Sequence, residues 1–222
     1  MTLKEELEQQ LAKFKQRASA ELAATLQAGV DELSESGIVE RAVKQGDMAP
    51  DFELPNAKGD AVALSALLSE GPVVLAFYRG GWCPYCNLQL RAYQRILPAI
   101  RDLGAQLVAI SPQAPDESLT TAEKNALEFE VLSDVGAKVA GAYRILFDLS
   151  DRLKAAYLGM GRDLSADNAD GQWHLPIPAT YVIDRDGRIE GAYIDPEYRN
   201  RLEPSQILDA LKTLRAAETT KP

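Results

Sequence analysis

The chain of 222 residues has two cysteines, Cys83 and Cys86, with two residues between them in the segment 81–86 (Gly-Trp-Cys-Pro-Tyr-Cys). Residues three apart are neighbours on a helix, so this spacing lets the two sulfurs meet as a reversible disulfide. A structural disulfide framework would use more cysteines at longer separations. A zinc site of four Cys or His ligands is excluded by counting, because His174 is the only histidine. The pair therefore predicts thiol redox chemistry.

The place of the cysteines in the chain favours a reactive thiolate. The apolar run 73–78 predicts a buried strand, and a helix is expected from about Pro84 to Leu103. Proline is tolerated at the first helical position, where no N–H partner is needed. Free backbone N–H groups and the helix dipole favour an anion there, so a cysteine at this place can have its pKa lowered below about 8.5. The alternative is a pair of buried small residues with no redox role.

Composition narrows the function classes. The net charge of −9 argues against a nucleic-acid partner, because phosphate binding needs a basic surface. The charged start of the chain lacks the apolar core of a signal peptide, and no apolar run approaches the ~18–20 residues that span a bilayer. We therefore expect a cytoplasmic protein without a membrane segment. We expect neither a metal nor another cofactor.

Residues 3–35 predict one long amphipathic helix. Its apolar residues recur every three or four positions, and they are Leu3, Leu7, Leu11, Phe14, Ala18, Leu22, Leu26, Val30 and Leu33. Gly37 is expected to end the helix. A helix of this length cannot bury its stripe alone, so it packs either on its own domain or on a second subunit in a homodimer.

From Gly46 onward, short strands alternate with helices, which predicts an α/β fold. The last two strands, 179–183 and 189–194, read as a hairpin around 184–187, so the central sheet should be mixed. Residues 159–172 look like a solvent loop. The other expected elements are strands at 52–54, 62–64, 105–110 and 129–132, and helices from Ser65 and near 116–127, 135–143, 149–158 and 204–217.

The stretch from Gly46 to about Leu214 resembles the thioredoxin-like fold of the peroxiredoxin (alkyl hydroperoxide reductase/thiol-specific antioxidant) superfamily. The resemblance rests on 46–52 (Gly-Asp-Met-Ala-Pro-Asp-Phe), Phe77-Tyr78, Leu132-Ser133-Asp134, and 180–187. The branch it looks most similar to carries Cys-Pro-Tyr-Cys and is related to the selenoprotein-U-like proteins. This implies a mixed central sheet flanked by helices, with residues 1–42 as an N-terminal helical extension to a domain at 43–217.

The chain departs from the family pattern at the site. Peroxiredoxins follow Phe-Tyr with Pro-x-x-x-Thr-x-x-Cys. Aligned without gaps, their peroxidatic cysteine falls on Cys86, their threonine on Cys83 and their proline on Arg79. The family's distant arginine has no match before Tyr181. That stretch, 176–180, instead resembles thioredoxins, which predicts a cis peptide bond before Pro178 facing the cysteines.

The resemblance implies a thiol peroxidase. A thiolate would attack the peroxide and become a sulfenic acid, the second cysteine would condense with it, and thioredoxin, a glutaredoxin-type protein or a low-molecular-weight thiol would reduce the disulfide. The alternatives are a thioredoxin-like disulfide reductase without peroxidase activity and a non-enzymatic redox sensor. Alignment points to Cys86 as the attacking sulfur, whereas the helix start points to Cys83 as the more exposed one.

The remaining candidates surround the cysteines in the expected fold. Arg79 would hold a thiolate or polarise a peroxide, unless it lies at the surface. Tyr85, expected to be exposed, would shape substrate access, and Trp82 would flank the site. His174, near the loop of Pro178, would donate a proton or serve only in packing.

Overall fold

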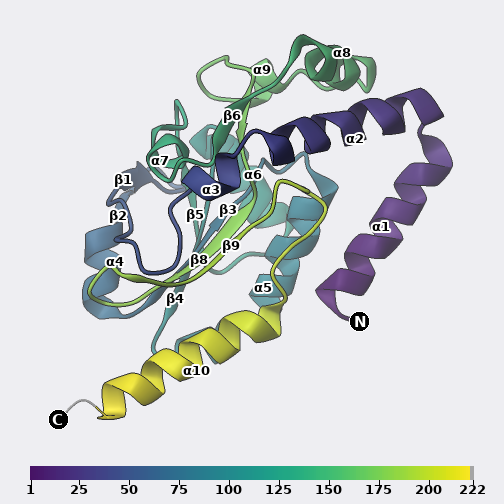
Figure 1. Cartoon of the computed structure of the whole chain (residues 1–222). Helices are drawn as coiled ribbons and strands as arrows, with labels where there is room; N and C mark the ends of the chain where they lie inside the picture. Colours follow the sequence, from purple (N-terminus) through teal and green to yellow (C-terminus); the bar gives the residue numbers. More distant parts are fainter. Residues whose placement is uncertain (221–222) are drawn as a thin grey trace.

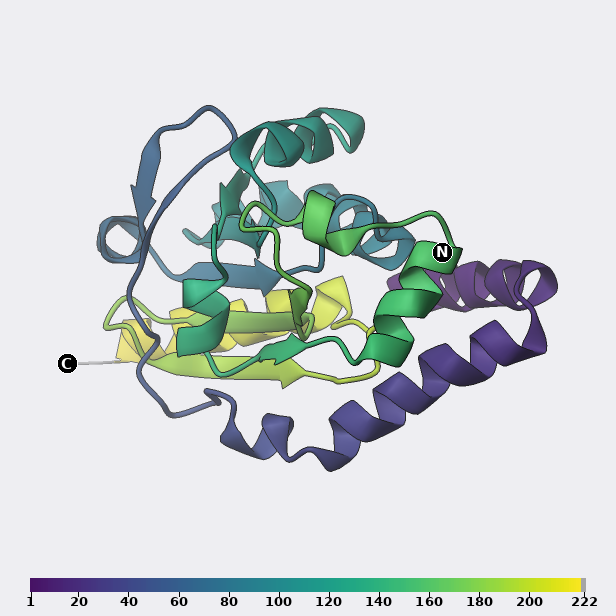
Figure 2. The ribbon, with the colours of Figure 1, turned by 90° about the horizontal axis from the view of Figure 1, so that it is seen from above.

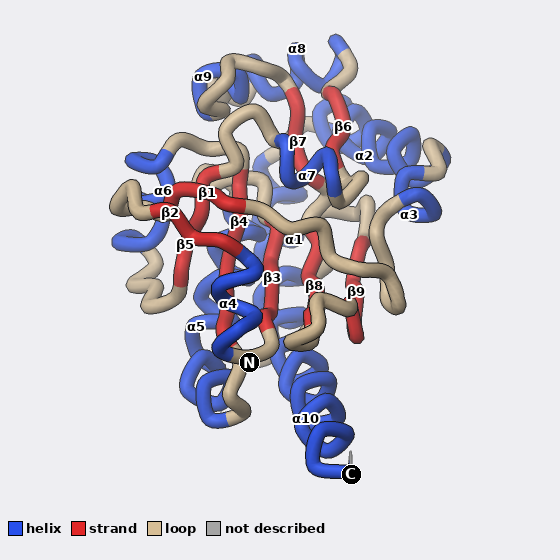
Figure 3. The backbone as a smooth tube through the Cα atoms, turned by 90° about the vertical axis from the view of Figure 1, so that its left-hand side faces the viewer, coloured by secondary structure: helices blue, strands red, loops and turns tan. Residues whose placement is uncertain are grey.

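The computed structural model describes residues 1–220, and a mixed five-stranded sheet lies at its centre. The strands are β3 (Val73–Phe77), β4 (Gln106–Ser111), β5 (Glu130–Ser133), β8 (Ala179–Ile183) and β9 (Ile189–Ile194). Their order is β5-β4-β3-β8-β9 (Figure 3). The first three are parallel, whereas β8 runs antiparallel to β3 and β9 to β8. The predicted mixed sheet is confirmed.

Both faces of the sheet are covered, because successive side chains of a strand point to opposite sides. Leu107 and Ala109 of β4 pack on one side, and Val108 and Ile110 on the other. The first side carries α1 (Leu3–Arg17), α5 (Pro84–Asp102) and α10 (Pro204–Thr220) (Figure 1). The second side carries α3 (Ile38–Arg41), β1 (Glu53–Pro55), β2 (Ala61–Ala63), α4 (Leu64–Glu70) and α7 (Lys138–Ala142). Helix α6 (Pro115–Lys124) packs beside β5.

The N-terminal segment is two helices rather than one. Helix α1 ends at Arg17, Ala18 is extended, and α2 runs from Ala20 to Glu35, so the two helices form a bent arm (Figure 2). The single helix predicted over 3–35 is therefore wrong. The physical reason is Ser19, whose side chain accepts a hydrogen bond from the N–H of Leu22 and starts a new helix. Helix α2 ends just before Gly37, whose φ of 71° stops the helix as predicted.

The apolar stripe of this arm is used within the chain. Leu3 and Leu7 are buried beside α5, and Leu26 and Val30 are buried along α2. Helix α2 packs on α8 (Asp151–Gly159). The stripe thus contacts the chain's own domain, as one of the two sequence interpretations expected. In residues 1–220, no helix combines the length and the apolar character needed to cross a membrane.

A second small layer lies beyond the central sheet. It is a two-stranded antiparallel sheet of β6 (Leu146–Asp148) and β7 (His174–Pro176), which the sequence interpretation missed. The solvent loop predicted at 159–172 is only partly a loop. It contains the short helix α9 (Leu164–Asp167), capped by Asp163, and the first residue of this helix, Leu164, is fully buried.

The peptide bond before Pro178 is trans, since residues 1–220 hold no cis peptide bond. The predicted cis bond is therefore wrong. The chain passes from β7 through Ile177 and Pro178 into β8. The Ile177 N–H donates to the Ile145 carbonyl, which extends the pairing of β6 with β7. A trans X-Pro bond, favoured by about 0.5–1 kcal/mol, fits this extended path.

Candidate active site

The two cysteines occupy the first turn of α5. Cys83 is the N-terminal capping residue, Pro84 takes the first helical position, and Cys86 follows two residues later. Both are free thiols, with exposed fractions of 1% and 0%. The predicted helix start is confirmed. Residues from α1, α2 and α8 cover this end of α5, so both sulfurs are buried, and Cys83, the one predicted to be the more accessible, borders a cavity whereas Cys86 does not.

The turn before α5 is held by buried amide side chains. The Gly81 N–H donates to the Gln113 side chain at 2.6 Å. Asn87 donates from its side chain to the carbonyls of Gly81 and Cys83, at 2.8 and 3.2 Å. Asn125 donates in turn to Asn87 at 2.8 Å. These contacts position Cys83 at the helix start.

Arg201 lies against Cys86, with 3.4 Å between its Nη2 and the Sγ. It comes from the segment between β9 and α10 and is buried. Gln89 holds it through a 2.7 Å bond from Nε to Oε1, and the carbonyls of Tyr198 and Asn200 accept from Nη1. The guanidinium is therefore fixed beside the sulfur.

Arg79 is the second buried guanidinium at the site. Its Cζ lies 5.0 Å from the ring centre of Trp82, 5.7 Å from that of Tyr157 and 4.2 Å from that of Tyr198. It donates to the Tyr157 hydroxyl, and its Nε has no hydrogen-bond partner among residues 1–220. In the described part of the chain, no ion pair joins Arg79 or Arg201 to a carboxylate. The two positive charges are therefore available to stabilise a thiolate or an anion that binds beside the thiols.

The surroundings shift the pKa values of the two thiols in opposite directions. Burial alone would raise the pKa of Cys86, but the hydrogen bond with Cys83 and the charges of Arg201 and Arg79 outweigh it and lower that pKa to about 5. Burial raises the pKa of Cys83 well above its ordinary value, and the adjoining Cys86 sulfur raises it further. Near neutral pH, Cys86 is therefore a thiolate and Cys83 a thiol that donates to it.

A cavity of about 210 Å³ opens onto Cys83, and we call it the thiol pocket. Arg79 lies on its wall, and most of the remaining wall is apolar or aromatic. The wall residues are Phe14, Leu26, Arg79, Trp82, Cys83, Pro84, Tyr85, Tyr157, Met160, Arg162 and Tyr198. A small molecule in this pocket would therefore lie against Cys83 and Arg79.

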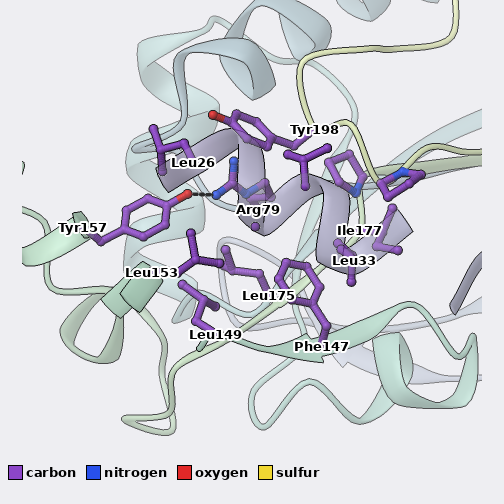
Figure 4. A pocket seen from close by; sticks show the side chains of 14 residues that line it. Leu26, Leu33, Arg79, Phe147, Leu149, Leu153, Tyr157, Leu175, Ile177 and Tyr198 are labelled. Carbon is purple, nitrogen blue, oxygen red and sulfur yellow. Dashed lines mark hydrogen bonds between the residues drawn. The ribbon is translucent and has the colours of Figure 1, made fainter. Parts of the chain in front are cut away.

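On the other side of Arg79 lies a narrower apolar cavity of about 30 Å³, the inner pocket (Figure 4). Figure 4 shows Arg79 between Tyr157 and Tyr198, with apolar side chains from α2, α8 and the β6–β7 sheet around the cavity. Leu26, Arg79, Tyr157 and Tyr198 line both pockets. These four side chains therefore separate the two cavities.

The structure brings some predicted site residues to the cysteines and leaves others aside. Arg79, Trp82 and Tyr85 line the thiol pocket. The exposure predicted for Tyr85 is wrong, because its ring is buried against Tyr198 at 5.7 Å between centroids. Pro178 lines the inner pocket instead. His174 lies in β7 with its Nε2 3.2 Å from a carboxylate oxygen of Asp170, outside the lining of both pockets.

Sequence reasoning missed Arg201, Gln89, Tyr157 and Tyr198. Gln89 had a local signal, since it follows Cys86 by three residues on the same helix face. Arg201 lies 115 positions from Cys86 and had no local signal. Its only clue was its place between the last strand and the final helix.

Known proteins resemble the chain over most of its length. Peroxiredoxin Q of Sedum lineare chloroplasts is 28% identical over 179 residues, which cover 81% of this chain and 80% of that protein. The corresponding protein of Triticum aestivum is 29% identical over 180 residues, covering 81% and 70%. Among solved structures, peroxidoxin BcpB of Mycobacterium tuberculosis superposes with a TM-score of 0.61 at 27% identity, covering 78% of this chain and 97% of that one.

The AhpC/TSA family matches residues 45–192, a stretch that contains the sheet from β3 to β8, both cysteines and Arg79. This agrees with the resemblance drawn from residues 46–52 and 180–187. The chain therefore belongs to the AhpC/TSA family.

Proposed function

We propose that this chain is a thiol peroxidase that reduces hydrogen peroxide or organic hydroperoxides through Cys83 and Cys86, and that thioredoxin or a similar dithiol recycles it. The observation that carries the proposal is the Cys86 sulfur, 3.4 Å from Arg201 and one helical turn from a second thiol. A thiolate stabilised by a fixed cation is the nucleophile that peroxide cleavage needs. Membership of a family whose relatives are named peroxiredoxins supports the same activity.

The first step uses Cys86. Its thiolate attacks the outer oxygen of the hydroperoxide, so an S–O bond forms and the O–O bond breaks. The leaving oxygen takes a proton and departs as water or an alcohol, and Cys86 becomes a sulfenic acid. The guanidiniums of Arg79 and Arg201 stabilise the negative charge that moves onto the leaving oxygen.

The second step uses Cys83. Its sulfur attacks Cys86, the S–S bond forms, and the sulfenic hydroxyl leaves as water with the Cys83 proton. Because Cys83 borders the thiol pocket, it is the sulfur that an incoming reductant attacks. An external dithiol then supplies two electrons and two protons and restores both thiols. A low-molecular-weight thiol would reach the same sulfur.

The proposal extends to the compartment and the oligomeric state of the protein. A single Cys-x-x-Cys suits a reducing compartment, and we propose the cytoplasm. A homodimer through residues 1–42 is a further proposal, supported by Leu11, Phe14 and Leu33, which stay partly exposed on the arm. Sedimentation at working concentration tests it.

Single cysteine variants test the peroxidase and the two roles. After one equivalent of hydrogen peroxide, Cys83→Ser should accumulate a sulfenic acid that dimedone traps, because no second thiol condenses with it. Cys86→Ser should react only at the rate of a free thiol. Mass spectrometry of the dimedone adduct and stopped-flow tryptophan fluorescence, with Trp82 next to Cys83, provide the measurements.

The reverse pattern would exchange the roles of the two cysteines. Slow reaction of the wild type and of both variants would reject the peroxidase and favour the alternative, a thioredoxin-like disulfide reductase. Insulin reduction by the same preparations gives that alternative its own positive readout.

A further inference from the structure

The thiol pocket is larger than the smallest hydroperoxide requires. Hydrogen peroxide is little larger than a water molecule, whose share of liquid volume is about 30 Å³. The pocket has a volume of about 210 Å³, and much of its wall is made by the rings of Phe14, Trp82 and Tyr157. Such a wall adds nothing to the binding of hydrogen peroxide, but it would bury the carbon skeleton of a substituted hydroperoxide at ~25 cal/mol per Å² of apolar area.

Two of the wall residues precede the region that matches the family. Phe14 lies in α1 and Leu26 in α2, both in the arm that precedes residue 45. Leu26 is buried, and it lines both the thiol pocket and the inner pocket. The arm therefore contributes directly to the route toward Cys83.

Polar contacts and close packing hold this part of the arm in place. Arg199 donates to the Gln27 side chain at 2.6 Å, and Gln27 is the neighbour of Leu26. Further along α2, Glu32 pairs with Arg152 of α8 at 2.5 Å. Gly29 lies so close to Leu153 of α8 that an added Cβ would come within 2.8 Å of that side chain. Leu26 is thus fixed against the pocket between anchored positions.

We propose that Phe14 and Leu26 are specificity-determining residues that bind the apolar group of an organic hydroperoxide while its O–O end faces Arg79 and the thiols. This inference rests on the proposed peroxidase function. It assigns substrate selection to the N-terminal arm rather than to the family domain. The chemical class is a hydroperoxide with a compact, bulky apolar substituent, because the thiol pocket has a volume of about 210 Å³ whereas the inner pocket behind it has only about 30 Å³.

The test narrows the pocket and compares two substrates. In Leu26→Phe, the larger ring takes space that a cumyl group needs and hydrogen peroxide does not. The ratio of kcat/KM for cumene hydroperoxide to that for hydrogen peroxide should fall about tenfold, equivalent to 1.4 kcal/mol. Phe14→Trp, at a less buried position, should lower the same ratio and serves if Leu26→Phe does not fold.

Matched controls introduce the same larger side chains, phenylalanine in α2 and tryptophan in α1, at other positions of the same helices. Leu22→Phe in α2 and Leu11→Trp in α1 replace partly buried leucines that line neither pocket. Both should keep the wild-type ratio. A wild-type ratio in Leu26→Phe and Phe14→Trp, or an equal fall in the controls, would overturn the inference. A wild-type chain that reduces neither hydroperoxide would instead reject the peroxidase function.

Discussion

At the scale of residues, the acidity of Cys86 depends on side chains from three separate parts of the chain. Cys83 lies on the same helix turn, Arg79 comes just after β3, and Arg201 precedes α10. Gln89 fixes Arg201, and its own amide nitrogen lies 3.3 Å from the Tyr93 hydroxyl. The charge arrangement thus belongs to the folded chain and is absent from the isolated Cys-Pro-Tyr-Cys segment.

The rate of reaction with peroxide should report this acidity. In the wild type, the rate constant should be flat above about pH 6 and fall as the pH drops through about 5, because protonation removes the Cys86 thiolate. Arg201→Met removes a cation that stabilises the thiolate, so the pKa of Cys86 should rise and the midpoint should move toward neutral pH. Stopped-flow fluorescence from pH 4 to 8 measures both profiles.

Arg95→Met serves as the control for Arg201→Met. Arg95 also lies on α5, but it is half exposed and pairs with Glu6 of α1. Its profile should match the wild type. An unchanged midpoint in Arg201→Met would show that Arg201 does not set the acidity of Cys86.

At the scale of elements, the break between α1 and α2 decides where the arm meets the pocket. The break at Ala18 and Ser19 turns the chain, so that Phe14 and Leu26 line the same cavity from two helices. A straight helix over 3–35 would place residues 12 positions apart about 18 Å from one another along its axis. The cap at Ser19 therefore has a structural consequence beyond its own hydrogen bond.

Ser19→Ala tests this cap. The substitution removes the acceptor for the Leu22 N–H, and the free energy of unfolding should fall by about 1 kcal/mol. Ser34→Ala, within α2, is the matched control. There the serine hydroxyl only donates to the Val30 carbonyl, and alanine is the better helix former, so stability should stay equal or rise slightly. Urea unfolding followed by circular dichroism measures both, and equal losses would contradict the role of the cap.

At the scale of the whole molecule, residues 1–42 belong to the apolar clusters on both sides of the sheet. Leu3 and Leu7 belong to the apolar cluster that contains α5 and α10, whereas Ile38 and Ala42 belong to the cluster on the opposite face. We propose that residues 1–42 are an N-terminal extension and residues 43–217 the thioredoxin-like domain, and that the two parts fold together as one cooperative unit. Burial of each large apolar side chain contributes about 1.5–3 kcal/mol, so the arm is a substantial part of the total stability.

Unfolding should therefore occur in a single step. In urea, the far-ultraviolet circular dichroism, which reports α1 and α2 among the helices, should coincide with the fluorescence of Trp82 and Trp173. Leu7→Ala should shift both transitions together and cost about 2–5 kcal/mol. Loss of helical signal ahead of the fluorescence change would mean that the arm unfolds independently.

Much of the fold could be predicted because its signals are local. Buried strands read as apolar runs such as 73–78, and Pro84 after Cys83 marked the helix that carries both thiols. The alternation of strands and helices, with the hairpin at 179–194, indicated the mixed sheet. The β6–β7 pair was not predicted because each strand has only three residues and 25 residues separate the two.

The sequence by itself determined where the reactive thiols lie and that a helix start presents them, since spacing and capping act within a few residues. Only the tertiary structure lowers the pKa of Cys86 and raises that of Cys83. Arg201 meets Cys86 across 115 positions, and the burial of Cys83, Cys86 and Tyr85 follows from helices that pack over them. Acidity depends on charges and solvent within a few ångströms, and in a folded chain those neighbours come from distant segments.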